Sequence, residues 1–146
     1  MHGDETVGRQ LMIFLAQYLL NNYGIEERVT HIVNTTDIFL MPSLNPDGYE
    51  ASEEGRCESR SGFEGRVNAN GVDLNRDFPD QFDNNNTDVD ILGGRQNETA
   101  AIMTWIVSNP FVLSGNLHGG AVVASYPYDD SGSGRICCEA SLSPDK

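Results

Sequence analysis

The stretch Ile38-Phe39-Leu40-Met41-Pro42-Ser43-Leu44-Asn45-Pro46-Asp47-Gly48 joins four consecutive apolar residues to a turn motif. The apolar run over 38–41 has the length of a buried strand, and Pro42 stops it. The motif Asn45-Pro46-Asp47-Gly48 is typical of a turn. The sequence therefore predicts a buried strand at 38–41 that ends in a turn at 45–48.

Helices are predicted on both sides of this strand. Apolar residues before it recur at helical spacing and predict a helix that Asp4 caps and Gly24 closes, followed by a shorter helix over about 26–34. A third helix is expected over 98–107, with Pro110 just past its end. The residues that define the first helix are Val7, Leu11, Phe14, Leu15, Tyr18 and Leu19.

Two further apolar runs, 111–113 and 121–124, are predicted as strands. Helices that alternate with apolar strands indicate an α/β fold, a sheet with helices on its faces. Ligands of such folds bind beyond the carboxyl ends of the strands. Because both 45–48 and His118 fall at predicted strand ends, we expect the functional site there.

The region over 45–95 is rich in Gly, Asn, Asp, Ser and Arg and has almost no periodicity. An irregular stretch of this length inside a compact domain is usually functional, so we expect it to line the site. A disordered linker between two small domains is the alternative, although the apolar residues Val72, Leu74 and Phe78 argue against it.

Composition limits the possible partners. The chain has 146 residues, enough for one domain, and its formal net charge is −13. This charge repels phosphate backbones, which argues against nucleic-acid binding and favours cationic partners or substrates. The longest apolar stretch, 11–16, is too short to span a membrane, and we see no signal peptide.

Three sequons, at Asn34, Asn85 and Asn97, favour a secretory or extracellular location, or the lumenal part of a membrane-bound parent. The cysteines leave the redox state open, because Cys57 is isolated while Cys137 and Cys138 are adjacent.

His2, Glu5 and His118 are candidate metal ligands. Two imidazoles and a carboxylate form a catalytic zinc set, in which a fourth position stays open for water. A His-x-x-Glu spacing is common by itself, and a surface histidine beside helix-capping acids is the simpler alternative. The remaining histidine, His31, and Trp105 are interpreted as a partly exposed side chain and a core residue.

Four motifs extend this hypothesis: 2–5, 42–48, 70–79 and 116–120. Together they resemble the zinc metallocarboxypeptidases, and Tyr126-Pro127-Tyr128-Asp129-Asp130 resembles the regulatory (N/E) branch of that family. The resemblance implies a partial carboxypeptidase-like domain over 1–130, a mixed sheet flanked by helices with a long irregular active-site loop, and a divergent C-terminal tail over 131–146. It also implies that Zn²⁺ is the cofactor.

The resemblance assigns roles to individual residues. Asn75 and Arg76 would hold the C-terminal carboxylate of a peptide, since a guanidinium meets a carboxylate with two charge-assisted bonds. Arg66 would polarise the scissile carbonyl and stabilise the oxyanion. Asp73 would accept a hydrogen bond from the metal-binding His2. Asp129 would select Lys or Arg as the released residue.

The alternatives for these residues are ordinary ones: a solvated polar turn at 73–76, an exposed arginine at 66, and surface charge at 129.

In this family a glutamate well beyond the third zinc ligand activates water, and we find no segment that resembles it after His118. We therefore expect a chain truncated at both ends, weakly active or inactive as a peptidase acting on C-terminal Lys or Arg. A non-catalytic form that binds zinc and peptide, and an acidic fragment that does not fold stably, are the alternatives.

Overall fold

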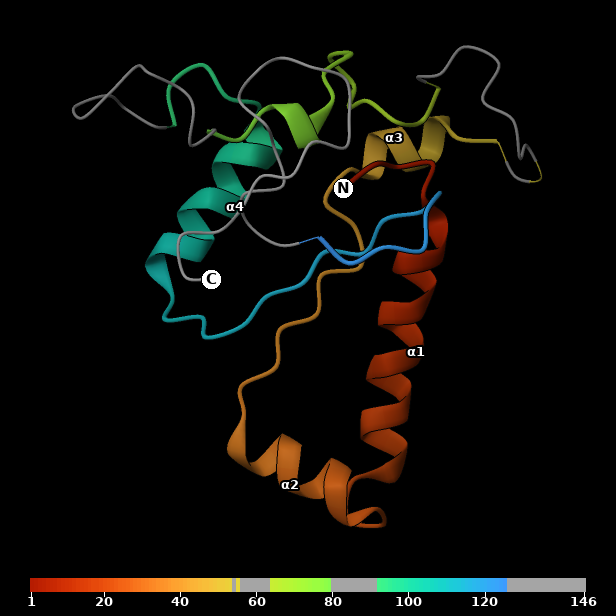
Figure 1. Ribbon diagram of the computed structural model, residues 1–146, viewed down its shortest axis with the longest axis vertical. Coiled ribbons are helices and arrows are strands. Elements are labelled where there is room, and N and C mark those ends of the chain that lie inside the picture. Colours follow the sequence, from red (N-terminus) through yellow and green to blue (C-terminus); the bar gives the residue numbers. More distant parts are fainter. Residues whose placement is uncertain (54, 56–63, 80–91, 126–146) are drawn as a thin grey trace.

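The computed structural model describes residues 1–53, 55, 64–79 and 92–125. Figure 1 shows a long helix and a short one that meet at a corner, with the other helices grouped around the N-terminus. The elements, in chain order, are α1 (Thr6–Asn22), α2 (Glu27–Thr35), α3 (Pro46–Ala51), the 3-10 helix η1 (Leu74–Arg76) and α4 (Asn97–Ser108).

The three helices predicted from apolar spacing are present within one or two residues of their expected bounds. Gly24 follows α1 with a φ of 78°, a left-handed conformation that glycine adopts at little cost and that ends helices. The prediction that Asp4 caps α1 is wrong: Glu5 occupies the cap position, without a side-chain cap hydrogen bond.

Residues 45–48, predicted as a turn, begin helix α3. The Asn45 side chain accepts a hydrogen bond from the Gly48 N–H at 2.9 Å, and Pro46 occupies the first helical position. Both are signals of a helix start, because the cap satisfies an unpaired N–H and proline has none to lose. The same motif is therefore compatible with a turn or a helix, and its surroundings select the helix.

The predicted sheet is not confirmed. Residues 36–41 and the runs 111–113 and 121–124 lie in irregular segments, and the described part of the chain contains no strand. Val112 is 100% exposed, so this run is not buried either. Apolar side chains alone do not make a strand. The main-chain N–H and C=O groups of the run also need a neighbouring strand with which to form hydrogen bonds.

Three aromatic rings hold the irregular segments to α4. Phe39, Trp105 and Phe111 contact one another edge to face, with ring centroids 5.0 to 5.6 Å apart. Edge-to-face contacts of this kind are favourable beyond the area they bury. Trp105, predicted as a core residue, is half-buried in this cluster.

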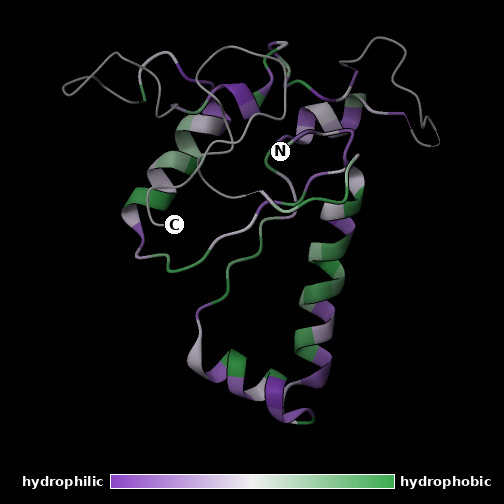
Figure 2. Cartoon of the chain, in the orientation of Figure 1, coloured by the Kyte–Doolittle hydropathy of each residue, from purple (hydrophilic) through white to green (hydrophobic). Residues whose placement is uncertain are grey.

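Most of the large apolar side chains of α1 are exposed, and Figure 2 shows the apolar stretches along this helix. Among the described residues, the buried side chains include the polar His2, Asn45, Asn68 and Thr99. Three of these lie around the N-terminal segment and its neighbouring loop. The buried apolar side chains among the described residues are Val29, Leu74 and Met103, so buried positions are as often polar as apolar. In the described part of the chain, no helix has the length and hydropathy that crossing a membrane requires.

Candidate metal centre

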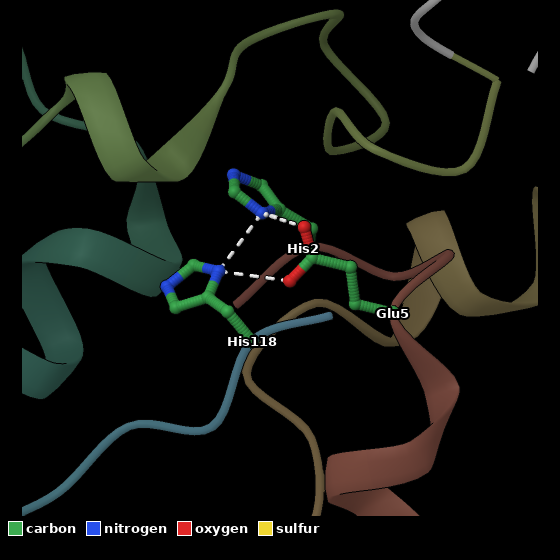
Figure 3. A group of neighbouring side chains, drawn as sticks. All are labelled: His2, Glu5 and His118. Carbon is green, nitrogen blue, oxygen red and sulfur yellow. Dashed lines mark hydrogen bonds and ion pairs between the residues drawn. The ribbon is translucent and has the colours of Figure 1, made fainter. Parts of the chain in front are cut away.

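His2, Glu5 and His118 converge on one point, although the two histidines are 116 positions apart in the sequence. Figure 3 shows both imidazole rings turned toward the Glu5 carboxylate. His2 Nδ1 lies 2.8 Å from Glu5 Oε1, His118 Nδ1 lies 2.8 Å from Glu5 Oε2, and the two Nδ1 atoms are 3.2 Å apart. One ligand atom from each residue lies within 4.8 Å of the others.

Glycines allow the segments that carry these ligands to approach closely. A Cβ on Gly3 would lie 2.1 Å from the Gly48 main chain, so the His2 segment rests directly on the first turn of α3. A Cβ on Gly8 would lie 2.9 Å from Leu117, which places the segment before His118 against α1. The Gly119 N–H donates to Glu5 Oε2 at 2.8 Å. The ligands are therefore positioned by main-chain contacts between distant segments.

The other ring nitrogen of His2 faces Asp73. His2 Nε2 lies 3.0 Å from Asp73 Oδ1, as the sequence hypothesis for Asp73 requires. A hydrogen bond from Nε2–H leaves the Nδ1 lone pair directed at Glu5 and His118. His2 is 6% exposed, so solvent does not compete strongly for either nitrogen.

Arg66 binds the second oxygen of Asp73, with Nε at 3.0 Å and Nη2 at 2.8 Å from Oδ2. Burial by itself raises the pKa of Asp73. Hydrogen bonds from His2, from the Asn75 N–H and from Arg66 outweigh burial and hold that pKa below its ordinary value of 3.8. Asp73 is therefore ionised at neutral pH and fixes both His2 and Arg66.

The Arg66 guanidinium also faces the ligands. Its Nη1 lies 3.6 Å from Glu5 Oε1 and 3.4 Å from His2 Nδ1. Burial of Glu5 raises its pKa, but the hydrogen bond from the Gly119 N–H, the contact with His2 and the attraction of the two imidazoles when they are protonated outweigh burial and lower it. A cationic side chain thus lies beside the ligand set, and its guanidinium is partly accessible.

Asn75 and Arg76 belong to η1 and are exposed. The Asn75 N–H donates to Asp73 Oδ1 at 2.9 Å, and Arg76 Nη1 donates to the Asn75 carbonyl at 2.9 Å. Asn75 and Arg76 therefore lie on the solvent-exposed side of the short helix that Asp73 caps. Asp129, the predicted specificity residue, lies outside the described residues.

The sequence analysis missed the side chains that hold this loop against α4. Asn68 Nδ2 donates to Gln96 Oε1 at 2.9 Å, and Asp77 Oδ2 accepts from the Gln96 N–H at 2.8 Å. Asn68 Oδ1 also accepts from the N–H groups of Asn70 and Val72. Only the Asn and Asp content of the loop hinted at such turns; its long-range partners are not visible in the sequence.

The ligand atoms fit a metal ion. A carboxylate only accepts hydrogen bonds, and an imidazole nitrogen without a proton also only accepts. Both Nδ1 atoms lie 2.8 Å from a Glu5 carboxylate oxygen and 3.2 Å from each other, and acceptors this close require a proton or a cation between them. Two imidazole nitrogens and a carboxylate oxygen match the donor preference of Zn²⁺. His2, Glu5 and His118 are therefore the residues that would hold it.

Comparison with known proteins agrees with this class of site. The sequence model of the zinc carboxypeptidase family matches residues 1–146. The chain belongs to the zinc carboxypeptidase family. The family's cofactor is Zn²⁺, and its reaction is hydrolysis of peptide bonds.

Individual relatives are highly similar to the chain. It is 57% identical to carboxypeptidase D of Drosophila melanogaster over 145 residues and 52% identical to that of Rattus norvegicus over 134 residues. It is 51% identical to carboxypeptidase M of Mus musculus over 130 residues. These alignments cover 99%, 92% and 89% of the chain, but only 10%, 9% and 27% of the relatives.

Proposed function

We propose that this chain carries the metal centre and part of the substrate-binding surface of a zinc carboxypeptidase that removes C-terminal Lys or Arg from peptides and proteins. The observation that supports it most directly is the convergence of His2, Glu5 and His118 on one point. The chain spans about a tenth of the carboxypeptidase D relatives, so its activity and substrates are part of the proposal.

Zinc bound at this site would supply a Lewis acid and lower the pKa of a bound water. The residues of the chain have the complementary tasks. His2, Glu5 and His118 would hold the metal, and Asp73 holds His2 in the tautomer that directs Nδ1 at the site. The contact between Asp73 and His2 exists before any substrate arrives, which lowers the reorganisation needed in the reaction.

Arg66 would stabilise the developing oxyanion of the scissile carbonyl. Its Nε and Nη2 are engaged by Asp73, which leaves Nη1 on the side of Glu5 and the metal ligands. A guanidinium restrained in this way by a carboxylate stays charged and loses little freedom when it meets a new negative charge.

Arg76 and Asn75 would bind the terminal carboxylate of the peptide. Both are exposed, on a short helix that begins beside Asp73, so a peptide end could reach them from solvent. We assign the preference for Lys or Arg to Asp129 and to the net charge of −13. A peptide without a free carboxyl end would lack the Arg76 contact, which restricts cutting to C-terminal residues.

A secretory or extracellular location belongs to the same proposal. Asn34 lies exposed at the end of α2, and Asn97 is the exposed first residue of α4, so both sequon asparagines face solvent. The third sequon, at Asn85, lies outside the described residues.

The test combines zinc stoichiometry with release of free arginine from a peptide that ends in Arg. We expect about one zinc per chain and arginine release that is weak at most, with both lost in His118→Ala. The matched control is His31→Ala, which removes an exposed histidine of α2 and should change neither quantity.

The same measurement separates the two functions that use this site. Zinc and peptide binding without released arginine would assign the chain to binding alone. Equal zinc content in His118→Ala and in the unmodified chain would contradict the metal centre itself.

A further inference from the structure

Asn45 is almost fully buried, and its side chain joins two segments of the chain. It is 1% exposed, and its Oδ1 accepts from the Gly48 N–H at 2.9 Å. Its Nδ2 donates to the main-chain carbonyls of Arg66 at 3.3 Å and Val67 at 3.1 Å. Both ends of the amide are therefore engaged, one with helix α3 and the other with the main chain at Arg66.

One glycine lies against this amide, and two more lie against that glycine. A Cβ on Gly48 would lie 2.5 Å from Asn45 Nδ2 and 2.6 Å from the Gly65 carbonyl oxygen. Gly65 has a φ of 79°, and its carbonyl accepts from the Asp4 N–H at 2.9 Å. Gly3 rests on Gly48. The segments at 2–5, 45–49 and 64–67 thus meet where main chain touches main chain, with Asn45 as the buried polar side chain at the junction.

This junction lies at the base of the Arg66 side chain. The guanidinium at the other end binds Asp73 and faces Glu5. Asp73 in turn binds His2. The direction of the guanidinium depends on where the Arg66 Cα lies, and the two donations from Asn45 hold the carbonyl groups at and after that Cα.

We propose that Asn45 is a positioning residue for Arg66: its amide fixes the main chain at 66–67 so that the guanidinium is held between Asp73 and the metal ligands. That Arg66 acts in hydrolysis rests on the proposed function. That Asn45 holds the main chain at Arg66 rests only on the contacts described above. The amide is needed because its two donors meet two carbonyl oxygens, which a carboxylate of the same shape would repel.

The variants follow from this chemistry. Asn45→Asp keeps the acceptor for the Gly48 N–H, and therefore the cap of α3, but removes both donors. Asn45→Ala removes both functions. Asn109→Asp is the matched control: Asn109 Nδ2 also donates to a main-chain carbonyl, that of Trp105 at 2.8 Å, at the end of α4.

The first readout is hydrogen exchange of the Arg66 Nε–H, followed by NMR on the metal-free 146-residue chain and assigned with Arg66→Lys. We expect Asn45→Asp and Asn45→Ala to accelerate this exchange about tenfold, the size of a lost hydrogen bond. Asn109→Asp should leave it unchanged. The first readout does not depend on hydrolysis.

The second readout is arginine release by the zinc-loaded chain. In Asn45→Asp we expect kcat to fall about 10²-fold, the cost of misplacing a catalytic group by about 1 Å, with little change in KM. In an Arg66→Ala background the same change should have no further effect, because the group that Asn45 positions is already absent.

Unchanged Nε–H exchange in a folded Asn45→Asp would overturn the proposal, as would additive effects of the two substitutions on kcat. Loss of helical circular dichroism in both Asn45 variants would assign the residue to folding instead and would also overturn it. Accelerated exchange in a chain that releases no arginine would support the proposal while contradicting the proposed function.

Discussion

At the scale of single residues, the site depends on side chains that make two contacts each. Asp73 binds His2 through one oxygen and Arg66 through the other, and the amide of Asn45 links α3 to the main chain at Arg66. Replacing either residue by alanine therefore releases both of its partners. The orientation of His2, one of the three candidate ligands, therefore depends on Asp73, which is not itself in the ligand set.

We predict that Asp73→Ala lowers the affinity for Zn²⁺ about 10- to 100-fold, because His2 loses the acceptor that fixes its ring and tautomer. A zinc competition titration measures the affinity. Asp47→Ala is the control, since Asp47 is an exposed acid on α3 and its removal changes the net charge by the same amount. Equal affinities of Asp73→Ala and the unmodified chain would contradict this role.

At the scale of elements, the corner between α1 and α2 is made of polar contacts. The Tyr18 hydroxyl donates to Glu26 Oε2 at 2.5 Å, and the Gly24 N–H donates to Thr30 Oγ1 at 2.8 Å. The hydrogen bond to Glu26 is the main reason that the pKa of Tyr18 lies above its ordinary value of 10.0. This contact therefore stabilises the corner only while the phenol is protonated.

We predict that Glu26→Gln lowers the pKa of Tyr18 toward 10.0, measured by tyrosinate absorbance with Tyr18→Phe as the subtraction. The pKa of Tyr18 is higher in the folded chain than in the unfolded one. The hydrogen bond to Glu26 therefore contributes fully to the free energy of unfolding below pH 10.0, and this contribution is lost as the pH rises through the raised pKa. Glu27→Gln, which changes the exposed neighbouring acid, should leave the titration unchanged.

At the scale of the whole molecule, few apolar side chains of the described part are buried, and the candidate metal site brings the N-terminal segment and His118 together. A shared metal would close a loop of 116 residues between His2 and His118. Because the ligands come together only in the folded chain, zinc should bind this state in preference to the unfolded one.

We predict that Zn²⁺ at about 100 times its dissociation constant raises the free energy of unfolding by about 2.7 kcal/mol, and that a chelator reverses the change. Urea unfolding with and without zinc measures it. Glu5→Gln should remove most of the increase. An equal urea midpoint with and without zinc would show that the three ligands do not share an ion.

Much of this structure was predictable, and the remainder depends on contacts between distant segments. Apolar spacing predicted α1, α2 and α4, because helices form from local periodicity. The predicted strands are not confirmed, since a strand depends on a partner elsewhere in the chain. The ligand set His2, Glu5 and His118 was predicted from residue types and family motifs, whereas the role of Asn45 was not, because no local pattern marks an amide that contacts Arg66.

The amino-acid sequence alone predicted the residues for the chemistry: a zinc-binding set of residue types, a candidate carboxylate anchor at Arg76, and an acidic net charge that favours basic substrates. The folded chain established the positions. His2 and His118 are adjacent because glycines 3, 8 and 48 let main-chain segments touch, and Arg66 is directed by Asn45 and Asp73. Residue types can be read from the sequence, but which segment lies against each of these glycines is decided only in the folded chain.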